Sequence, residues 1–187
     1  MVILASESPR RRELLGSICK EFDICSSDTA EMSEGADIFL LPELNAKLKA
    51  AAVAKQHPDD LVIGADTAII FEGRFIGKPR DIEDAKELLS GFSGKKHFVV
   101  TGVAVIRKGK NPVDISYREI SEIKFKEIDA DTIERYLKLV NVLDKAGAYA
   151  IQEHGDMIID DYSGELENII GLPLKKLSEI IRNRSLL

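Results

Sequence analysis

The segment 61–71, LVIGADTAIIF, constrains the fold more than any other stretch of this chain. Its apolar residues run on both sides of Asp66, and a run of this length and composition is typical of a buried strand. In a strand, Val62, Gly64 and Asp66 share one face. An unpaired carboxylate in such a place is costly to bury. The segment therefore predicts a strand in which Asp66 needs a cation, a metal or an exposed position.

Two interpretations of Asp66 stay open on local grounds. It is either a structural carboxylate that accepts hydrogen bonds from backbone amides, or a metal ligand or general base at a cleft. Gly64 and Ala65 beside it have little bulk, which lets a ligand approach closely. That feature favours the second interpretation.

The rest of the chain alternates between strand and helix patterns, and two strand pairs resemble antiparallel hairpins. This mixture predicts an α/β fold in which helices flank a mixed, twisted sheet around a central cleft. The expected domain is a single one of residues 1–187, as one body or as two lobes around the cleft. Expected strands are 2–6, 21–27, 61–71, 76–79, 97–106, 115–125 and 157–160. Expected helices are 9–18, 42–56, one that starts after Asp81 and ends at Gly91, one that starts near Asp129, and one that follows Pro173.

Composition excludes several classes of protein. The chain has 187 residues and a net charge of −6, from 26 basic and 32 acidic residues, which argues against a coat on polymeric nucleic acid. Cys19 and Cys25 form no CxxC pair, so they are expected to be free thiols. His57, His97 and His154 lack the spacing of a zinc site. No signal peptide or membrane-length apolar run is present, so we expect a cytoplasmic protein without membrane contact.

Three arginines stand where a helix is expected to begin. Ser8 suits the cap and Pro9 the first helical position, and Arg10, Arg11 and Arg12 follow. Cations are unfavourable at a helix N-terminus, because that end already carries positive charge. One interpretation is a solvated helix end. The other is an anion site, in which backbone N–H groups, the Ser8 hydroxyl and a guanidinium face a phosphate.

Other polar residues are ambiguous on their own. Lys49 and Lys78 are either surface charges or partners for Asp66 and an anion. Glu31 is either a solvated loop acid or a second oxygen ligand for a hard cation such as Mg²⁺. The segment 144–152, DKAGAYAIQ, has no clean period, and it is either a structural turn or a pocket wall in which Gln152 contacts a base edge.

Five motifs, taken together, resemble the Maf (septum-formation) family and cover nearly the whole chain. They are LASESPRRRELL, GADTAIIFEGRFIGKPRD, LLSGFSGKKHFVVTGVAV, DKAGAYAIQ and NIIGLPL, in the family's order. The resemblance implies a fold similar to that of inosine-triphosphate pyrophosphatases. It also implies a usually dimeric nucleoside-triphosphate pyrophosphatase that uses Mg²⁺ or Mn²⁺ and releases a monophosphate and pyrophosphate.

Carried over by position, the resemblance makes Asp66 the proton acceptor. Arg10, Thr67 and Gln152 match the positions tied to substrate choice. Polar residues that line the family's cleft correspond to Glu31, Lys49 and Lys78. Under this interpretation Asp66 and Glu31 hold the metal, and Ser8 belongs to the phosphate site.

The segment DKAGAYAIQ resembles the family branch that prefers dTTP and UTP over 7-methyl-GTP. The chain departs from that branch at Ala150 and Glu153, where glycines are usual, so the base preference stays open. Two rivals also stay open: a purine pyrophosphatase that prefers ITP or XTP, and a non-catalytic nucleotide sensor that regulates division.

Overall fold

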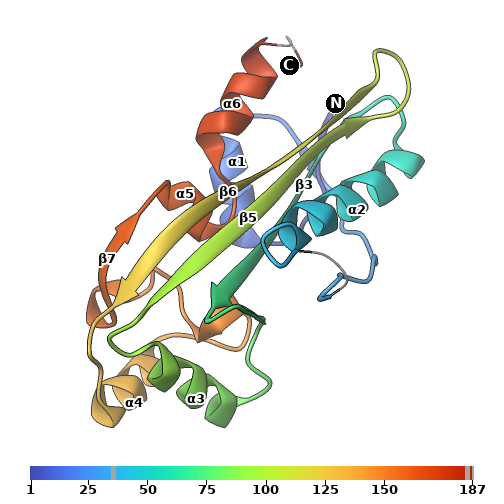
Figure 1. Ribbon diagram of the computed structural model, residues 1–187. Helices are drawn as coiled ribbons and strands as arrows, with labels where there is room; N and C mark the ends of the chain where they lie inside the picture. The colour runs from blue at the N-terminus through green and yellow to red at the C-terminus, as the bar shows by residue number, and fades with distance from the viewer. Residues whose placement is uncertain (35–36, 184–185, 187) are drawn as a thin grey trace. The chain divides into compact units, whose positions relative to one another are not determined.

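The apolar runs form the strands of one mixed β-sheet in the computed structural model, which describes residues 1–34, 37–183 and 186. The described strands are β1 (Val2–Leu4), β2 (Asp23–Ile24), β3 (Leu61–Phe71), β4 (Arg74–Ile76), β5 (Lys96–Arg107), β6 (Val113–Phe125) and β7 (Ile159–Ser163). Their order is β2-β1-β3-β5-β6-β7, with β4 paired to β3 outside this path. Figure 1 labels β3, β5, β6 and β7 of this order. The strand β1 pairs in parallel with β2 and β3, whereas β3–β4 and β6–β7 are antiparallel. The predicted α/β fold with a mixed sheet is confirmed.

The chain divides into two compact units, and each is described here by itself. The first comprises Met1–Thr67, Thr101–Glu119 and Glu165–Leu187, and the second comprises Ala68–Val100 and Ile120–Gly164. The single domain expected over residues 1–187 stays a prediction.

In the first unit, side chains alternate along β3 between two apolar cores. Leu61 and Ile63 join a core to which α1 (Pro9–Ile18) contributes Leu15 and α6 (Leu174–Asn183) contributes Leu177. Val62 points to the other face and packs with alanines of α2 (Leu41–Gln56). Because successive side chains of a strand point to opposite faces, Asp66 faces α2 and Thr67 faces α1.

Glycines allow α2 to lie unusually close to the sheet. A Cβ atom at Gly64 would lie 2.5 Å from the carbonyl oxygen of Ala46, and one at Gly102 would lie 2.3 Å from the backbone of Pro42. This close approach brings polar side chains of α2 within reach of Asp66 on β3.

The second unit holds an aromatic core beneath α3 (Ile82–Phe92). Phe92 lies 4.5 Å from His97 and 5.4 Å from Phe125 between ring centroids, and Tyr149 lies 5.2 Å from Phe125. This unit also contains α4 (Ala130–Leu139), η1 (Ala146–Ala148) and η2 (Gly155–Met157). Helices α3 and α4 both begin where the sequence predicts, and Asp81 and Asp129 each accept a backbone N–H of the helix that follows.

Several elements differ from the sequence predictions. The strand expected at 76–79 lies at Arg74–Ile76, and the strand expected at 21–27 is reduced to Asp23–Ile24. The helix predicted to end at Gly91 continues to Phe92, and the strand expected at 157–160 begins only at Ile159, because Met157 belongs to η2. The short helix α5 (Leu166–Ile170) was not predicted, since one and a half turns are too few to show a period. None of the helices formed by the described residues is long and apolar enough to cross a membrane.

Candidate active site

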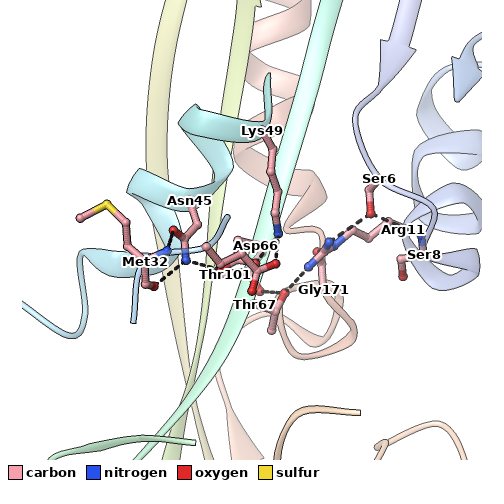
Figure 2. A network of polar contacts seen from close by, with 11 residues as sticks. Ser6, Ser8, Arg11, Met32, Asn45, Lys49, Asp66, Thr67, Thr101 and Gly171 are labelled. Atoms are coloured by element: carbon pink, nitrogen blue, oxygen red, sulfur yellow. Dashed lines mark hydrogen bonds and ion pairs between the residues drawn. The ribbon is translucent and has the colours of Figure 1, made fainter. Parts of the chain in front are cut away.

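Asp66 is a buried carboxylate with a different partner on each oxygen. Its exposed fraction is 5%. The Oδ1 atom accepts a hydrogen bond from Lys49 Nζ at 2.7 Å, and the Oδ2 atom accepts one from Asn45 Nδ2 at 3.1 Å (Figure 2). Lys49 and Asn45 lie four residues apart on α2 and therefore on the same helix face. Burial of the charge is thus offset by an ammonium and an amide from one helix.

Lys49 also joins Asp66 to Glu31. Its ammonium lies 2.6 Å from Glu31 Oε1, so a single cation bridges two carboxylates. The Lys49 side chain is largely buried, at 14% exposure, whereas Glu31 is 57% exposed. Three of the residues singled out from the sequence are therefore brought together in the first unit.

The arrangement suits a hard divalent cation, because two carboxylate oxygens converge on one position. Across residues 1–34, 37–183 and 186, no group of three or more His, Cys, Asp or Glu side chains gathers around a common point. Mg²⁺ commonly takes one or two carboxylates and completes its shell with water and substrate phosphates. Asp66 and Glu31 fit that pattern, with the Lys49 ammonium between them.

A second network lies on the opposite face of β3 and centres on Arg11. Its guanidinium donates from Nη2 to Thr67 Oγ1 at 3.0 Å, from Nη1 to Ser6 Oγ at 3.1 Å and from Nε to the carbonyl oxygen of Gly171 at 2.9 Å (Figure 2). Three acceptors in fixed directions match the planar fork of an arginine. This network therefore holds α1 against β3 and the segment that precedes α6.

The donor and acceptor in each hydrogen bond around Thr67 can be assigned from the groups that it contacts. Thr101 donates its single hydroxyl proton to the carbonyl oxygen of Asn168 at 2.9 Å, because a carbonyl only accepts. Thr67 must then donate to Thr101 across their 3.0 Å contact. The Thr67 oxygen accepts from Arg11, so its proton is already committed to Thr101. Toward a ligand, Thr67 is left with an acceptor lone pair only.

Sequence reasoning selected Arg10 for substrate choice, whereas the contacts described above belong to Arg11. Burial lowers the pKa of Arg11, Asp66 opposes that shift, and the charge of Arg10 adds to it. Arg11 nevertheless stays cationic, as guanidinium groups do in proteins. A signal was present in the sequence: Arg11 precedes the buried Leu15 by four residues and so faces inward with it. The role of Arg10 stays a prediction.

The start of α1 retains the features expected of an anion site. Ser8 occupies the N-cap position, but its hydroxyl makes no capping hydrogen bond. Pro9 lies in the first turn. The first turn contains no acidic residue. Its backbone N–H groups therefore have no carboxylate within the same turn to satisfy them.

Lys78 and Gln152 belong to the second unit and are exposed there. Residues 151–154, which include Gln152, form a turn. Lys145 is 4% exposed and donates to the carbonyl oxygen of Asn141, and it pairs with Glu153 at 3.3 Å. The predicted contact of Gln152 with a base stays untested.

Comparison with known proteins decides the family. The family described as "Maf-like protein" matches residues 1–184. The chain belongs to this family. A curated dTTP/UTP pyrophosphatase of Akkermansia muciniphila is 44% identical over 96% of this chain and 94% of its own length. One of Clostridioides difficile is 38% identical over 97% of this chain and 93% of its own length.

The Maf-like fold also resembles that of a solved structure outside the group of close relatives. The Staphylococcus aureus Ham1 protein superposes with a TM-score of 0.57 over 98% of both chains, at 15% sequence identity. At this identity the likeness concerns the fold alone. The resemblance stated from five sequence motifs is thus confirmed at the level of family and fold.

Proposed function

We propose that this Maf-like chain is a pyrophosphatase that hydrolyses dTTP and UTP to the monophosphate and pyrophosphate. Its relatives carry that name and match it almost from end to end. The observation that carries the proposal is the convergence of Glu31, Lys49 and Asp66, in which two carboxylates lie within 2.7 Å of one ammonium. A nucleotide sensor that performs no chemistry has no need of paired carboxylates beside its phosphate site.

The reaction is attack of water on the α-phosphorus, with cleavage of the bond to the oxygen that bridges the α- and β-phosphates. Asp66 would orient that water and take its proton, while pyrophosphate leaves with the bonding electron pair. Phosphoryl transfer depends mostly on positioning and charge neutralisation. A rigid strand, on which Asn45 holds the Oδ2 atom of Asp66, suits this task.

A divalent cation, Mg²⁺ or Mn²⁺, would be held by Asp66 and Glu31 and would neutralise negative charge on the phosphates. Lys49 would then turn its ammonium toward a phosphate oxygen, because its stem is long enough to move while its base stays on α2.

The remaining roles follow from the family resemblance and form part of the same proposal. Arg10, Ser8 and the first-turn amides of α1 would bind phosphate oxygens, and Lys78 would add positive charge. Thr67 and Gln152 would select the base. We also propose a cytoplasmic homodimer that acts on free nucleotides.

Pyrophosphate release from a panel of nucleotides tests the proposal. The panel contains dTTP, UTP, ITP, XTP and 7-methyl-GTP, each with Mg²⁺, with Mn²⁺ and with EDTA. We expect dTTP and UTP to be the best substrates and EDTA to abolish turnover. Higher rates with ITP or XTP would show that the protein is a purine pyrophosphatase instead. Absence of turnover with all five nucleotides would contradict the proposal that it is an enzyme of this kind.

Asp66→Asn tests the role of the carboxylate. Turnover should fall by about 10³-fold or more while nucleotide still binds. Asp114→Asn is the matched control, since Asp114 is an exposed carboxylate whose Oδ1 lies 2.8 Å from Lys47 Nζ. Equal turnover in Asp66→Asn and the control would contradict the assignment.

A further inference from the structure

Asn45 is a buried amide in an otherwise alanine-rich stretch of α2. Its exposed fraction is 1%, and the neighbouring positions Ala46 and Ala50 belong to the apolar core on this face of the sheet. The sequence pattern assigned it no role. A polar side chain at this depth is retained only if its hydrogen bonds are made.

Three hydrogen bonds satisfy this amide and determine its orientation. Asn45 Oδ1 accepts the backbone N–H of Met32 at 2.7 Å, and Nδ2 donates to the carbonyl oxygen of Met32 at 3.0 Å. The second proton of Nδ2 goes to Asp66 Oδ2 at 3.1 Å. Because an N–H only donates and a carbonyl only accepts, reversal of the amide would oppose like groups at all three contacts.

The contact with Met32 places Glu31. Residues 31–33 have no regular secondary structure, so no helix or sheet hydrogen bonds hold them. The pair of bonds from Asn45 to one backbone unit resembles a strand pairing and fixes the residue that follows Glu31 (Figure 2). The exposed Glu31 side chain therefore begins from an anchored backbone.

The hydrogen bond from Asn45 to Asp66 gives the two carboxylate oxygens different surroundings. Asn45 occupies Oδ2, which leaves Oδ1 toward Lys49 and Glu31. A carboxylate held on one oxygen cannot rotate freely about its terminal bond. Asn45 thus acts on both carboxylates. It holds Glu31 indirectly, through the backbone of Met32, and it holds Asp66 directly, through a hydrogen bond to Oδ2.

We propose that Asn45 is a positioning residue that sets Glu31 and Asp66 on either side of Lys49. The inference deepens the proposed function and rests on it, because the two carboxylates matter for turnover only if the chain is a pyrophosphatase. Its structural half, the anchoring of Met32, stands apart from any activity.

Two variants separate the anchoring of Met32 from the effect on turnover. Asn45→Leu removes the acceptor and both donors, whereas Asn45→Asp keeps an oxygen for the Met32 N–H and removes both donors. Gln56→Leu serves as the control, because Gln56 is an exposed amide at the end of the same helix. Turnover with dTTP is measured together with hydrogen exchange of the Met32 amide by NMR, the latter without nucleotide or metal.

In Asn45→Leu we expect kcat to fall by about 10–100-fold with KM changed by less than about threefold, together with faster exchange at Met32. In Asn45→Asp we expect the same loss of kcat with Met32 exchange slower than in Asn45→Leu, because one oxygen still accepts the Met32 N–H while the other opposes the Met32 carbonyl oxygen and Asp66 Oδ2. A residue that contributed only to stability would leave kcat of the folded fraction unchanged.

A wild-type kcat in either variant would overturn the proposal, and so would unchanged Met32 exchange in Asn45→Leu. If Asn45→Leu does not fold, Asn45→Asp decides through its kcat. If the wild type releases no pyrophosphate from any nucleotide, the proposed function fails, while Met32 exchange still reports whether Asn45 anchors the segment of Glu31.

Discussion

The ammonium group of Lys49 lies 2.7 Å from Asp66 Oδ1, and both groups are largely withdrawn from water. A carboxylate in such a place is stable as an anion only while a cation or several donors remain beside it. Lys49 supplies that cation in the first unit, and Glu31 approaches it from the other side. Under the proposed function a divalent cation occupies the same position, so the ammonium and a metal would stabilise one pair of carboxylates by the same means.

We therefore expect Lys49→Met to destabilise the protein and to make it dependent on a divalent cation. Loss of one partner of a buried ion pair typically costs about 3–5 kcal/mol. Because Mg²⁺ would relieve the uncompensated carboxylates, it should raise the Tm of Lys49→Met more than that of the wild type. Thermal unfolding followed by circular dichroism, with Mg²⁺ and with EDTA, measures both effects.

Lys47→Met on the same helix is the control for this prediction. Lys47 pairs with Asp114 at 2.8 Å, but both side chains are exposed, and such pairs contribute about 0–1 kcal/mol. Equal responses of the two variants to Mg²⁺ would show that the carboxylates are not a cation site.

Gly64 controls how closely α2 approaches the strand that carries Asp66. In Gly64→Ala the new Cβ would lie 2.5 Å from the oxygen of Ala46 and 2.9 Å from Ala50 Cβ, so α2 must move away. We expect a loss of about 1–3 kcal/mol in the free energy of unfolding, and a loss of turnover, because Lys49 moves with the helix. Urea denaturation and pyrophosphate release measure the two.

The matched substitution is Gly16→Ala on α1, where an added Cβ meets nothing within 4 Å. Alanine is favoured over glycine in a helix by about 1 kcal/mol, so this variant should be more stable than the wild type. A Gly64→Ala protein as stable and as active as Gly16→Ala would contradict the close approach.

The face of Asp66 could be predicted from the sequence because it depends on strand periodicity. The helix start could be predicted because proline favours the first helical position. The pairing of Glu31 with Lys49 has no such local signal, since it joins an irregular segment to a helix, and only the family resemblance placed the two residues in one cleft. The role of Asn45 could not be predicted for a related reason. Its partner is the backbone of Met32, and a residue pattern does not show which backbone groups a side chain contacts.

Arg11 illustrates the opposite case, in which a readable signal was passed over. It precedes Leu15 by one helical turn, and Leu15 is fully buried, so an inward direction for Arg11 follows from helix geometry alone. Which acceptors it meets there, Ser6, Thr67 and the carbonyl of Gly171, depends on chain segments far apart in sequence.

Thr101 should be coupled energetically to Thr67. Thr101→Val removes the hydroxyl that accepts from Thr67 and donates to Asn168, and it leaves buried polar groups without that partner. We expect a loss of about 1–3 kcal/mol. In the double variant with Thr67→Val the losses should be less than additive by about 1 kcal/mol. Urea denaturation of the wild type, the two single variants and the double variant provides the coupling energy. Full additivity would contradict the hydrogen bond from Thr67 to Thr101.

His97 should make the protein less stable in mild acid. Burial lowers its pKa from 6.5 to about 4. The unfolded chain therefore binds more protons between these values, so the free energy of unfolding decreases as the pH falls from 6.5 toward 4. The full difference corresponds to about 3 kcal/mol. His97→Gln should flatten this dependence, because glutamine can still bond the Tyr149 hydroxyl, which lies 2.7 Å from His97 Nε2, without a titration. Urea denaturation at several pH values measures it.

The control for His97→Gln is His154→Asn. His154 is exposed and has a left-handed backbone with φ of 54°, a conformation that asparagine tolerates, so the substitution should introduce little strain. It removes a histidine from the surface and should retain the wild-type dependence on pH. Since carboxylates also titrate in this range, the informative quantity is the difference between each variant and the wild type. An identical slope for His97→Gln and the wild type would mean that His97 becomes protonated in the folded protein without penalty, in conflict with its place among Phe92, Phe125 and Tyr149.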